Sequence, residues 1–223
     1  VLQKLAIMHR LNWGKYKKSK FIIGITGTNG KTTTKEILNK ILSSNLKVYA
    51  TKGNLNNHIG VPLTILALKK NHNIGVIELG ANHEGEIKQL CQIANPTHGI
   101  ITNIGEAHLE GFKNIDTIIK TKNELYNHIK KTGGTIFINK LDPLLVNLVK
   151  QYKKIVFYSC EKLNEKESAN RNAFYFSSNP TLQLSHQGYK INTNIIGKYN
   201  AQNLAASITI AKEFNIQLKS IIK

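Results

Sequence analysis

A glycine-rich segment, Gly27–Thr34, reads Gly-Thr-Asn-Gly-Lys-Thr-Thr-Thr and limits the folds open to the chain around it. It follows a short apolar stretch and precedes a segment in which apolar residues recur with helical period. Glycines allow the backbone to approach phosphate oxygens closely, and successive N–H groups at a helix N-terminus bind anions. A strand, a glycine loop and a helix in this order predict a nucleotide-phosphate site.

Two side chains of this segment suit phosphate chemistry. Lys31 offers a point charge to the β- and γ-phosphates, and Thr32 offers a hydroxyl to Mg²⁺, which prefers oxygen ligands. The common phosphate loop also has a glycine six positions before the lysine, where this chain has Ile25. An ordinary glycine turn before a helix would explain the glycines but not the Gly-Lys-Thr sequence. The residues predicted to bind ATP here are Gly27, Thr28, Asn29, Gly30, Lys31, Thr32 and Thr33.

Short β-rich apolar runs alternate with segments of helical period over most of the chain. Such alternation is typical of a parallel sheet covered by helices. The predicted helices Thr33–Ser43 and Glu86–Ala94 each gather their apolar residues on one face. We therefore predict an α/β fold with a P-loop-type, mostly parallel sheet flanked by helices. The predicted strands are Lys20–Gly24, Lys47–Ala50, Ile74–Leu79, Gly99–Asn103, Gly134–Asn139 and Lys154–Tyr158.

The C-terminal part departs from this pattern. Residues 161–172 are polar and turn-rich, and two alternating stretches follow, Thr181–Ser185 and Tyr189–Ile195, on either side of a Gln-Gly pair. They predict a small antiparallel hairpin. Helical period returns over Asn200–Phe214.

The N-terminal segment predicts one more helix. Leu2, Leu5, Ile7 and Met8 are interrupted by basic residues, which is typical of a basic amphipathic helix over Val1–Leu11.

Composition narrows the partners and the compartment. The formal net charge of +18 favours anionic ligands, but the lysines are scattered and aromatic residues make up only 7%, so no nucleic-acid partner is predicted. A polyanionic, nucleotide-bearing substrate suits the same charge. The longest apolar runs, such as Phe21–Ile25, are too short to cross a bilayer, so no membrane insertion is expected. Cys91 and Cys160 lie far apart without a metal-binding pattern, which favours reduced thiols and a cytoplasmic protein.

Four motifs, taken in order along the chain, carry a resemblance to a known family. They are Gly27–Thr32, the asparagine-rich Gly53–Pro62, the acidic Glu78–His83 and Ala107–Phe112, which reads Ala-His-Leu-Glu-Gly-Phe. Together they resemble the Mur ligases, and most of all the branch that adds D-alanyl-D-alanine to UDP-N-acetylmuramoyl-tripeptide. The resemblance runs from the N-terminus to about Phe214.

The resemblance implies ATP and two Mg²⁺ ions, with a set of residues around them. Glu78 stands at the end of a predicted strand, where open α/β sheets gather their ligands. Family members carry an N-carbamate on the lysine that aligns with Lys122, which turns a cation into a metal ligand. The implied catalytic residues are Lys31, Glu78, His108 and Lys122, and the implied metal ligands are Thr32, Glu78, His108 and carbamylated Lys122.

Two further segments take their roles from the resemblance alone. Gly197–Asn203 matches the family segment that approaches the ATP base and ribose, which assigns Asn200 and Asn203 to ATP binding; Asn200 also suits a helix N-cap. The family usually has histidine where this chain has Tyr199 and aspartate where it has His58. The implied substrate-binding residues are Asn54, Leu55, Asn56 and Asn57.

The implied reaction transfers the γ-phosphoryl group of ATP to a substrate carboxylate, and an amine then attacks the acyl phosphate. We expect residues 1–19 to be the exit helix and linker of an N-terminal substrate domain. Residues 20–216 are then the central ATP-binding domain, and residues 217–223 begin a linker to a C-terminal domain. A monomer is expected, and little ligase activity is expected from this chain alone.

Three alternatives stay open from the sequence. The chain could belong to another ligase of the superfamily that acts on a different amino acid or on folate. It could instead be a nucleotide-binding module without catalysis, for which a disrupted metal set would be the sign. It could also be a basic nucleic-acid-binding protein, for which salt-sensitive DNA binding that ATP does not displace would be the sign.

Overall fold

The computed structural model describes residues 1–15, 20–105, 114–163 and 172–221. Within these ranges nine strands form one sheet in the order β2-β3-β1-β4-β5-β6-β7-β8-β9. Neighbouring strands from β2 to β7 are parallel, and the last two pairings are antiparallel. The strands are β1 Phe21–Thr26, β2 Val48–Ala50, β3 Ile74–Glu78, β4 His98–Ile101, β5 Thr135–Asn139, β6 Ile155–Lys162, β7 Ala173–Ser178, β8 Thr181–His186 and β9 Tyr189–Ile196.

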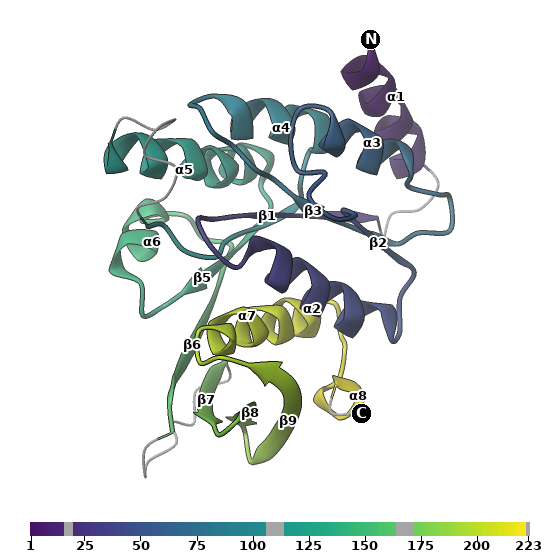
Figure 1. The fold of residues 1–223 in the computed structure, drawn as a ribbon. Helices are drawn as coiled ribbons and strands as arrows, with labels where there is room; N and C mark the ends of the chain where they lie inside the picture. Colours follow the sequence, from purple (N-terminus) through teal and green to yellow (C-terminus); the bar gives the residue numbers. More distant parts are fainter. Residues whose placement is uncertain (16–19, 106–113, 164–171, 222–223) are drawn as a thin grey trace.

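Helices cover both faces of the parallel part of the sheet (Figure 1). On one face, α2 (Lys31–Ser43) packs beside α7 (Asn200–Glu213), with the short α8 (Leu218–Ile221) near the C-terminus. The other face is covered by α1 (Leu2–Lys15), α3 (Gly60–Leu66), α4 (Glu86–Ala94), α5 (Ile115–Thr132) and α6 (Pro143–Leu148).

The sheet separates two apolar cores. In β1, Ile23 and Ile25 enter the core under α2 and α7, whereas Ile22 enters the core under the other helices. Alternate residues of a strand point to opposite faces, so a strand buried on both sides must be apolar at successive positions. This burial explains the nearly continuous Phe-Ile-Ile-Gly-Ile run that the sequence carries.

The parallel sheet and its helical layers confirm the predicted fold class. The predicted helix Glu86–Ala94 has the bounds of α4, and its apolar residues Ile87, Leu90 and Cys91 are buried. The C-terminal hairpin is present as β8 and β9, but it continues the main sheet through β7, which the sequence did not predict. Phe174 and Tyr175 of β7 are both buried, so no alternation of polar and apolar residues marks that strand.

The predicted apolar face of the N-terminal helix was wrong in part. Leu5 and Met8 are exposed, at 49% and 62% of their surface, whereas Ala6 and Trp13 are buried. Helix α1 packs against α3 and α4, and Trp13 Nε1 donates to the carbonyl oxygen of Lys69, just after α3, at 3.0 Å. None of the described helices is both long enough and apolar enough to cross a membrane.

Three loops that carry sequence motifs follow neighbouring strands at one edge of the sheet. The glycine loop follows β1, Glu78 ends β3, and Thr102 follows β4. The strand order places β3 and β4 on either side of β1. In open α/β sheets ligands bind at this carboxyl edge, so the topology brings the predicted residues to one place.

Candidate functional site

The glycine loop has a backbone shape that its glycines make possible. Gly27 has φ of 146° and Gly30 has φ of 79°, both in the region that favours glycine. A Cβ atom on Gly27 would lie 1.9 Å from Thr102 Oγ1, and one on Gly30 would lie 2.5 Å from Asn203 Oδ1. Helix α2 begins at Lys31, directly after Gly30, so its first N–H groups face the loop.

Two residues after β4 hold the loop in place. Thr102 Oγ1 donates to the carbonyl oxygen of Asn29 at 2.6 Å, and the Asn29 N–H donates to Asn103 Oδ1 at 3.0 Å. The Thr28 N–H donates to the carbonyl oxygen of Asn103 at 3.0 Å. Thr102 and Asn103 were not predicted as site residues, because a threonine and an asparagine after a strand are common in loops.

The Lys31 ammonium is held over this loop. Its Nζ donates to the carbonyl oxygens of Gly27 and Thr28, each at 2.9 Å. Burial lowers the pKa of Lys31, and the nearby Glu78 carboxylate opposes that shift. The charge therefore lies where an anion on the loop would meet it.

Glu78 is the buried carboxylate of the site, with 1% of its surface exposed. Thr32 Oγ1 donates to its two carboxylate oxygens at 3.0 and 3.2 Å. Asn56 Nδ2 donates to Oε1 at 2.9 Å, and the Lys35 ammonium lies 3.8 Å from Oε2. The phosphate-loop helix, the asparagine-rich segment and β3 thus meet at one carboxylate.

The donor set fits Mg²⁺. Thr32 and Glu78 present oxygen atoms within 3.2 Å of one another beside the phosphate loop. Magnesium in phosphoryl-transfer sites is held by one or two protein oxygens, with waters and phosphates completing its octahedron. No cluster of three or more histidine, cysteine or acidic residues lies close enough to hold a metal in the part of the chain that the structure describes, and such a magnesium site does not need one.

Lys122 reaches the same loop from α5. It is buried, and its Nζ donates to the carbonyl oxygen of Gly27 at 3.1 Å. Burial, with a smaller contribution from the charge of Lys31, lowers the pKa of Lys122 to about 8. Lys120, in contrast, is exposed and forms an ion pair with Glu84. The predicted residue His108 lies outside the described residues.

The two asparagines assigned to ATP lie at the start of α7, against the phosphate loop. Asn203 Oδ1 accepts from Thr34 Oγ1 at 3.2 Å, and Asn203 Nδ2 donates to Asn200 Oδ1 at 3.1 Å. Asn200 does not cap the helix, because its Nδ2 donates to the carbonyl oxygen of Ile196 at 2.9 Å. Both line a cavity of about 540 Å³, which also includes Asn29, Gly30, Thr33, Thr102, Asn103, Asn139, Asp142, Tyr199 and Gln202.

The predicted substrate segment splits into two parts. Asn56 and Asn57 line a second cavity of about 410 Å³, whereas Asn54 and Leu55 are exposed and do not line it. The Asn56 carbonyl oxygen accepts from the Gly80 N–H at 2.8 Å, which fixes this segment to the end of β3. Asn57 Oδ1 accepts from the Gly60 N–H at 2.9 Å and so closes the turn into α3.

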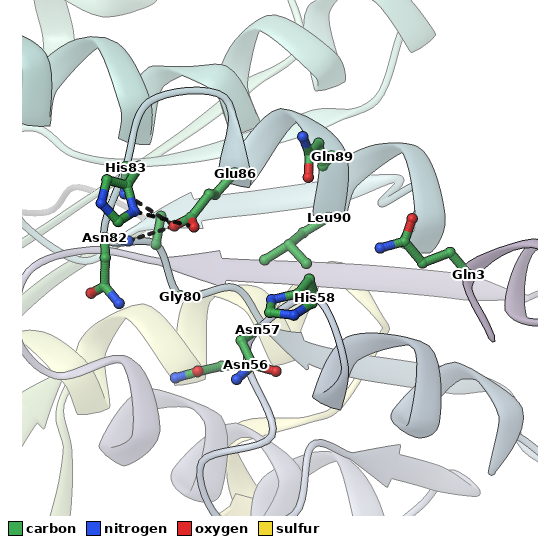
Figure 2. A pocket seen from close by; sticks show the side chains of 11 residues that line it. Gln3, Asn56, Asn57, His58, Gly80, Asn82, His83, Glu86, Gln89 and Leu90 are labelled. Carbon is green, nitrogen blue, oxygen red and sulfur yellow. Dashed lines mark hydrogen bonds and ion pairs between the residues drawn. The ribbon is translucent and has the colours of Figure 1, made fainter. Parts of the chain in front are cut away.

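Figure 2 shows this second cavity, with Gln3 of α1 at one end and the pair His83 and Glu86 at the other. His83 Nδ1 lies 3.5 Å from Glu86 Oε1. Burial acts to raise the pKa of Glu86, but hydrogen bonds from the N–H groups of Asn82 and His83 outweigh it, so the pKa is lowered. The remaining lining residues are His58, Gly80, Ala81, Gln89 and Leu90.

A glycine phosphate loop, a buried carboxylate beside it and a cavity at the start of α7 define a nucleotide-binding α/β domain of the P-loop type. The chain belongs to the Mur ligase middle domain family, which matches residues 25–211.

Relatives and solved structures agree with the family. The UDP-N-acetylmuramoyl-tripeptide–D-alanyl-D-alanine ligase of Bacillus subtilis is 36% identical over 200 residues, which cover 87% of this chain and 42% of that protein. A crystal structure of MurF from Acinetobacter baumannii superposes with a TM-score of 0.82 at 31% identity, covering 99% of this chain and 48% of that one. MurF ligase from Thermotoga maritima in complex with ADP gives 0.80 at 27% identity, covering 100% and 52%. The chain thus spans about half the length of the proteins it matches.

Proposed function

We propose that this chain is the ATP-binding catalytic domain of a ligase that joins D-alanyl-D-alanine to UDP-N-acetylmuramoyl-tripeptide. One observation carries the proposal. Lys31, Thr32, Glu78 and Lys122 converge on the glycine loop from three separate elements, α2, β3 and α5. The relatives named after this reaction support the choice of substrates.

The proposed chemistry has two steps. A substrate carboxylate oxygen attacks the γ-phosphorus of ATP, the bond to the bridging oxygen breaks, and ADP leaves. The amine of the second substrate then attacks the acyl carbon, an amide bond forms through a tetrahedral intermediate, and phosphate leaves with loss of a proton from the amine. Such transfers depend on positioning and charge neutralisation more than on a protein nucleophile.

Each part of ATP and each metal ion would have its own set of residues. The loop N–H groups and Lys31 would hold the phosphates, and Asn200 and Asn203 would border the nucleoside. Thr32 and Glu78 would hold Mg²⁺, which neutralises charge on the transferring group when it is bound. We propose a second ion held by His108 and by Lys122 as an N-carbamate. The lowered pKa of Lys122 supports this role, because only the neutral amine reacts with carbon dioxide.

The cavity of about 410 Å³ is proposed as the place of the acyl substrate. Asn56 lines this cavity and also donates to Glu78, so a carboxylate bound there would lie close to the metal ligand. His58 lines the same cavity and replaces the aspartate that is common in the family, which makes it a candidate for this chain's own substrate contacts.

The division of the chain remains part of the proposal. Residues 20–216 would form the ATP-binding domain, with residues 1–19 and 217–223 leading toward substrate domains. The matched proteins are about twice as long as this chain, which supports a need for further domains in ligation. Buried thiols at Cys91 and Cys160, without a disulfide, suit a reducing compartment such as the cytoplasm.

A domain exchange tests the proposal. The matching region of the Bacillus subtilis ligase is replaced by this chain, and phosphate release is measured with each substrate alone and with both. We expect release that requires ATP, the tripeptide precursor and D-alanyl-D-alanine together, and no such release from the isolated chain. Release driven by a different amino acid, or by the isolated chain with both substrates, would overturn the proposal. If the hybrid does not fold, binding of ADP to the chain itself decides whether the nucleotide site exists.

A further inference from the structure

A buried lysine outside the predicted set touches the centre of the site. Lys35 lies in α2, one turn after Lys31, and its side chain has no exposed surface. It is among the largest fully buried side chains of the described residues. Lysine is almost never fully buried unless its charge is paired, because removing an ammonium from water costs several kcal/mol.

Lys35 has three oxygen neighbours, one through a hydrogen bond and two through ion pairs. Its Nζ donates to the carbonyl oxygen of Gly53 at 3.1 Å and lies 2.9 Å from Glu36 Oε1. The third partner is Glu78 Oε2, at 3.8 Å. Glu36 is largely exposed, with 59% of its side-chain surface accessible, whereas Glu78 has 2%.

The Gly53 and Glu78 contacts act on the same carboxylate. Gly53 opens the segment whose Asn56 donates to Glu78 Oε1, so an anchor on Gly53 also places Asn56. The direct contact is on the other oxygen, Oε2. The Lys35 ammonium lies beside Oε2, Asn56 donates to Oε1, and Thr32 donates to both oxygens, so the carboxylate has a polar neighbour on each side.

Stability alone does not explain a charge at this position. Well-packed apolar side chains often replace buried ion pairs with no loss, or a gain, of stability. A methionine would fill a similar volume in α2 without the desolvation of an ammonium. A charge at this position is explained if its partner must be held in one orientation, as a ligand of a cation must.

We propose that Lys35 is a positioning residue that orients Glu78, and with it the asparagine-rich segment, for Mg²⁺-dependent nucleotide binding. The inference rests on the proposed function for the role of Glu78. Partners of metal ligands typically change metal affinity by about 10- to 100-fold when they are removed. If Lys35 positions Glu78, removing its charge should lower the nucleotide affinity that depends on Mg²⁺. The affinity that the phosphate loop provides without Mg²⁺ should stay the same.

Calorimetric titration of the chain with the β,γ-imido analogue of ATP, in Mg²⁺ and in EDTA, tests this. We expect Lys35→Met to weaken binding about 10- to 100-fold in Mg²⁺ and to leave binding in EDTA within about threefold. The matched control is Lys40→Met, on the exposed side of the same helix, which should change neither value. In a Glu78→Gln background, Lys35→Met should have no further effect on the Mg²⁺ dependence.

The outcomes separate the two ideas. A wild-type chain that binds no nucleotide overturns the proposed function and this inference with it. A wild-type chain that binds, with Lys35→Met either keeping the full effect of Mg²⁺ or losing affinity equally in EDTA, overturns the inference alone. If the methionine variant does not fold, Lys35→Gln removes the charge but keeps an N–H donor, and the same comparison is made with it.

Discussion

Lys122 Nζ lies 3.1 Å from the carbonyl oxygen of Gly27, although the two residues are 95 positions apart in the chain. The contact places a buried amine against the phosphate loop, beside the positive charge of Lys31. Both burial and that charge disfavour protonation. Burial and the charge of Lys31 therefore lower the pKa of Lys122 to about 8 and enlarge its neutral fraction, at a position where sequence alone predicts a solvated lysine.

We predict that Lys122 takes up carbon dioxide. Carbamate forms from the neutral amine and carbon dioxide with release of one proton. At fixed bicarbonate, its fraction should therefore rise with pH until the amine is mostly neutral, near its pKa of about 8, and then level off. The carbamate fraction of an ordinary lysine would continue to rise until about pH 10. Carbon-13 NMR in labelled bicarbonate measures the carbamate signal.

The neighbouring lysine serves as the control for this experiment. Lys120 is exposed, and its hydrogen bond and ion pair with Glu84 raise its pKa, so Lys120→Met should keep the signal. Free α-amino groups titrate at about pH 8 and also form carbamates, so the N-terminal amine is chemically blocked in every sample. Lys122→Met should then abolish the signal that levels off at about pH 8. A signal that survives in Lys122→Met, or that keeps rising to pH 10, contradicts the assignment.

Substitution of Gly27 should damage the phosphate loop. In Gly27→Ala the new Cβ would meet Thr102 Oγ1 at 1.9 Å, and the backbone would carry an alanine at φ of 146°. We expect a loss of at least about 2 kcal/mol in unfolding free energy, or a rearranged loop that binds ADP at least about tenfold more weakly. Urea unfolding and calorimetry measure the two effects.

Gly188→Ala is the control for backbone strain, so its difference from Gly27→Ala measures the effect of the clash with Thr102. Gly188 also has a positive φ, of 79°, but a Cβ atom added there would meet no atom within 4 Å beyond its chain neighbours. Only the backbone strain of about 1 kcal/mol should appear there, with ADP binding unchanged. Equal effects of the two substitutions would show that the Thr102 contact does not shape the loop.

The fold could be predicted where residue types with special backbone or charge properties, or a clear spacing of apolar residues, mark an element. Gly27, Gly30 and Lys31 mark the phosphate loop because few residue types tolerate its backbone or supply its charge. Helix α4 was predicted to the residue because Ile87 and Leu90 repeat with helical spacing beneath a polar surface. Strand β7 was missed because its buried residues, Ala173 to Tyr175, form a run too short to stand out directly after a polar segment.

The site was only partly predictable for a related reason. Glu78 could be found because it ends an apolar strand, where ligands gather. Lys35 could not, because a lysine one turn after another lysine in a helix has the pattern of a solvated face, and only the packing of α2 on the segment after Gly53 buries it. Asn103 likewise gains its role from the neighbouring β1 loop, which the sequence does not place beside it.

Removal of the Lys31 charge should weaken nucleotide binding without unfolding the chain. Lys31 is half-buried and bonds only to loop carbonyl oxygens among its described partners, at 2.9 Å from Gly27 and Thr28. Hydrogen bonds to charged groups contribute about 1.5 to 3 kcal/mol, so Lys31→Met should weaken ADP binding about 10- to 100-fold. The control is Lys40→Met, which should bind ADP as the wild type does. Equal affinities of the two variants would show that Lys31 does not contact the phosphates.

Asn203→Ala should reduce both stability and nucleotide affinity, because one amide serves two partners. Its Oδ1 accepts from Thr34 and its Nδ2 donates to Asn200, and the alanine leaves both of these buried groups without that partner. Each such loss costs about 1 to 3 kcal/mol, so we expect a lower urea midpoint with an unchanged m-value. Adenosine diphosphate should bind about tenfold more weakly, because the same residue borders the cavity beside Gly30.

Asn194→Ala, at an exposed position of β9, is the matched control and should leave both quantities unchanged. If Asn203→Ala lowers stability while ADP binds as in the wild type, the amide is a structural link between α2 and α7 and not part of the nucleotide site.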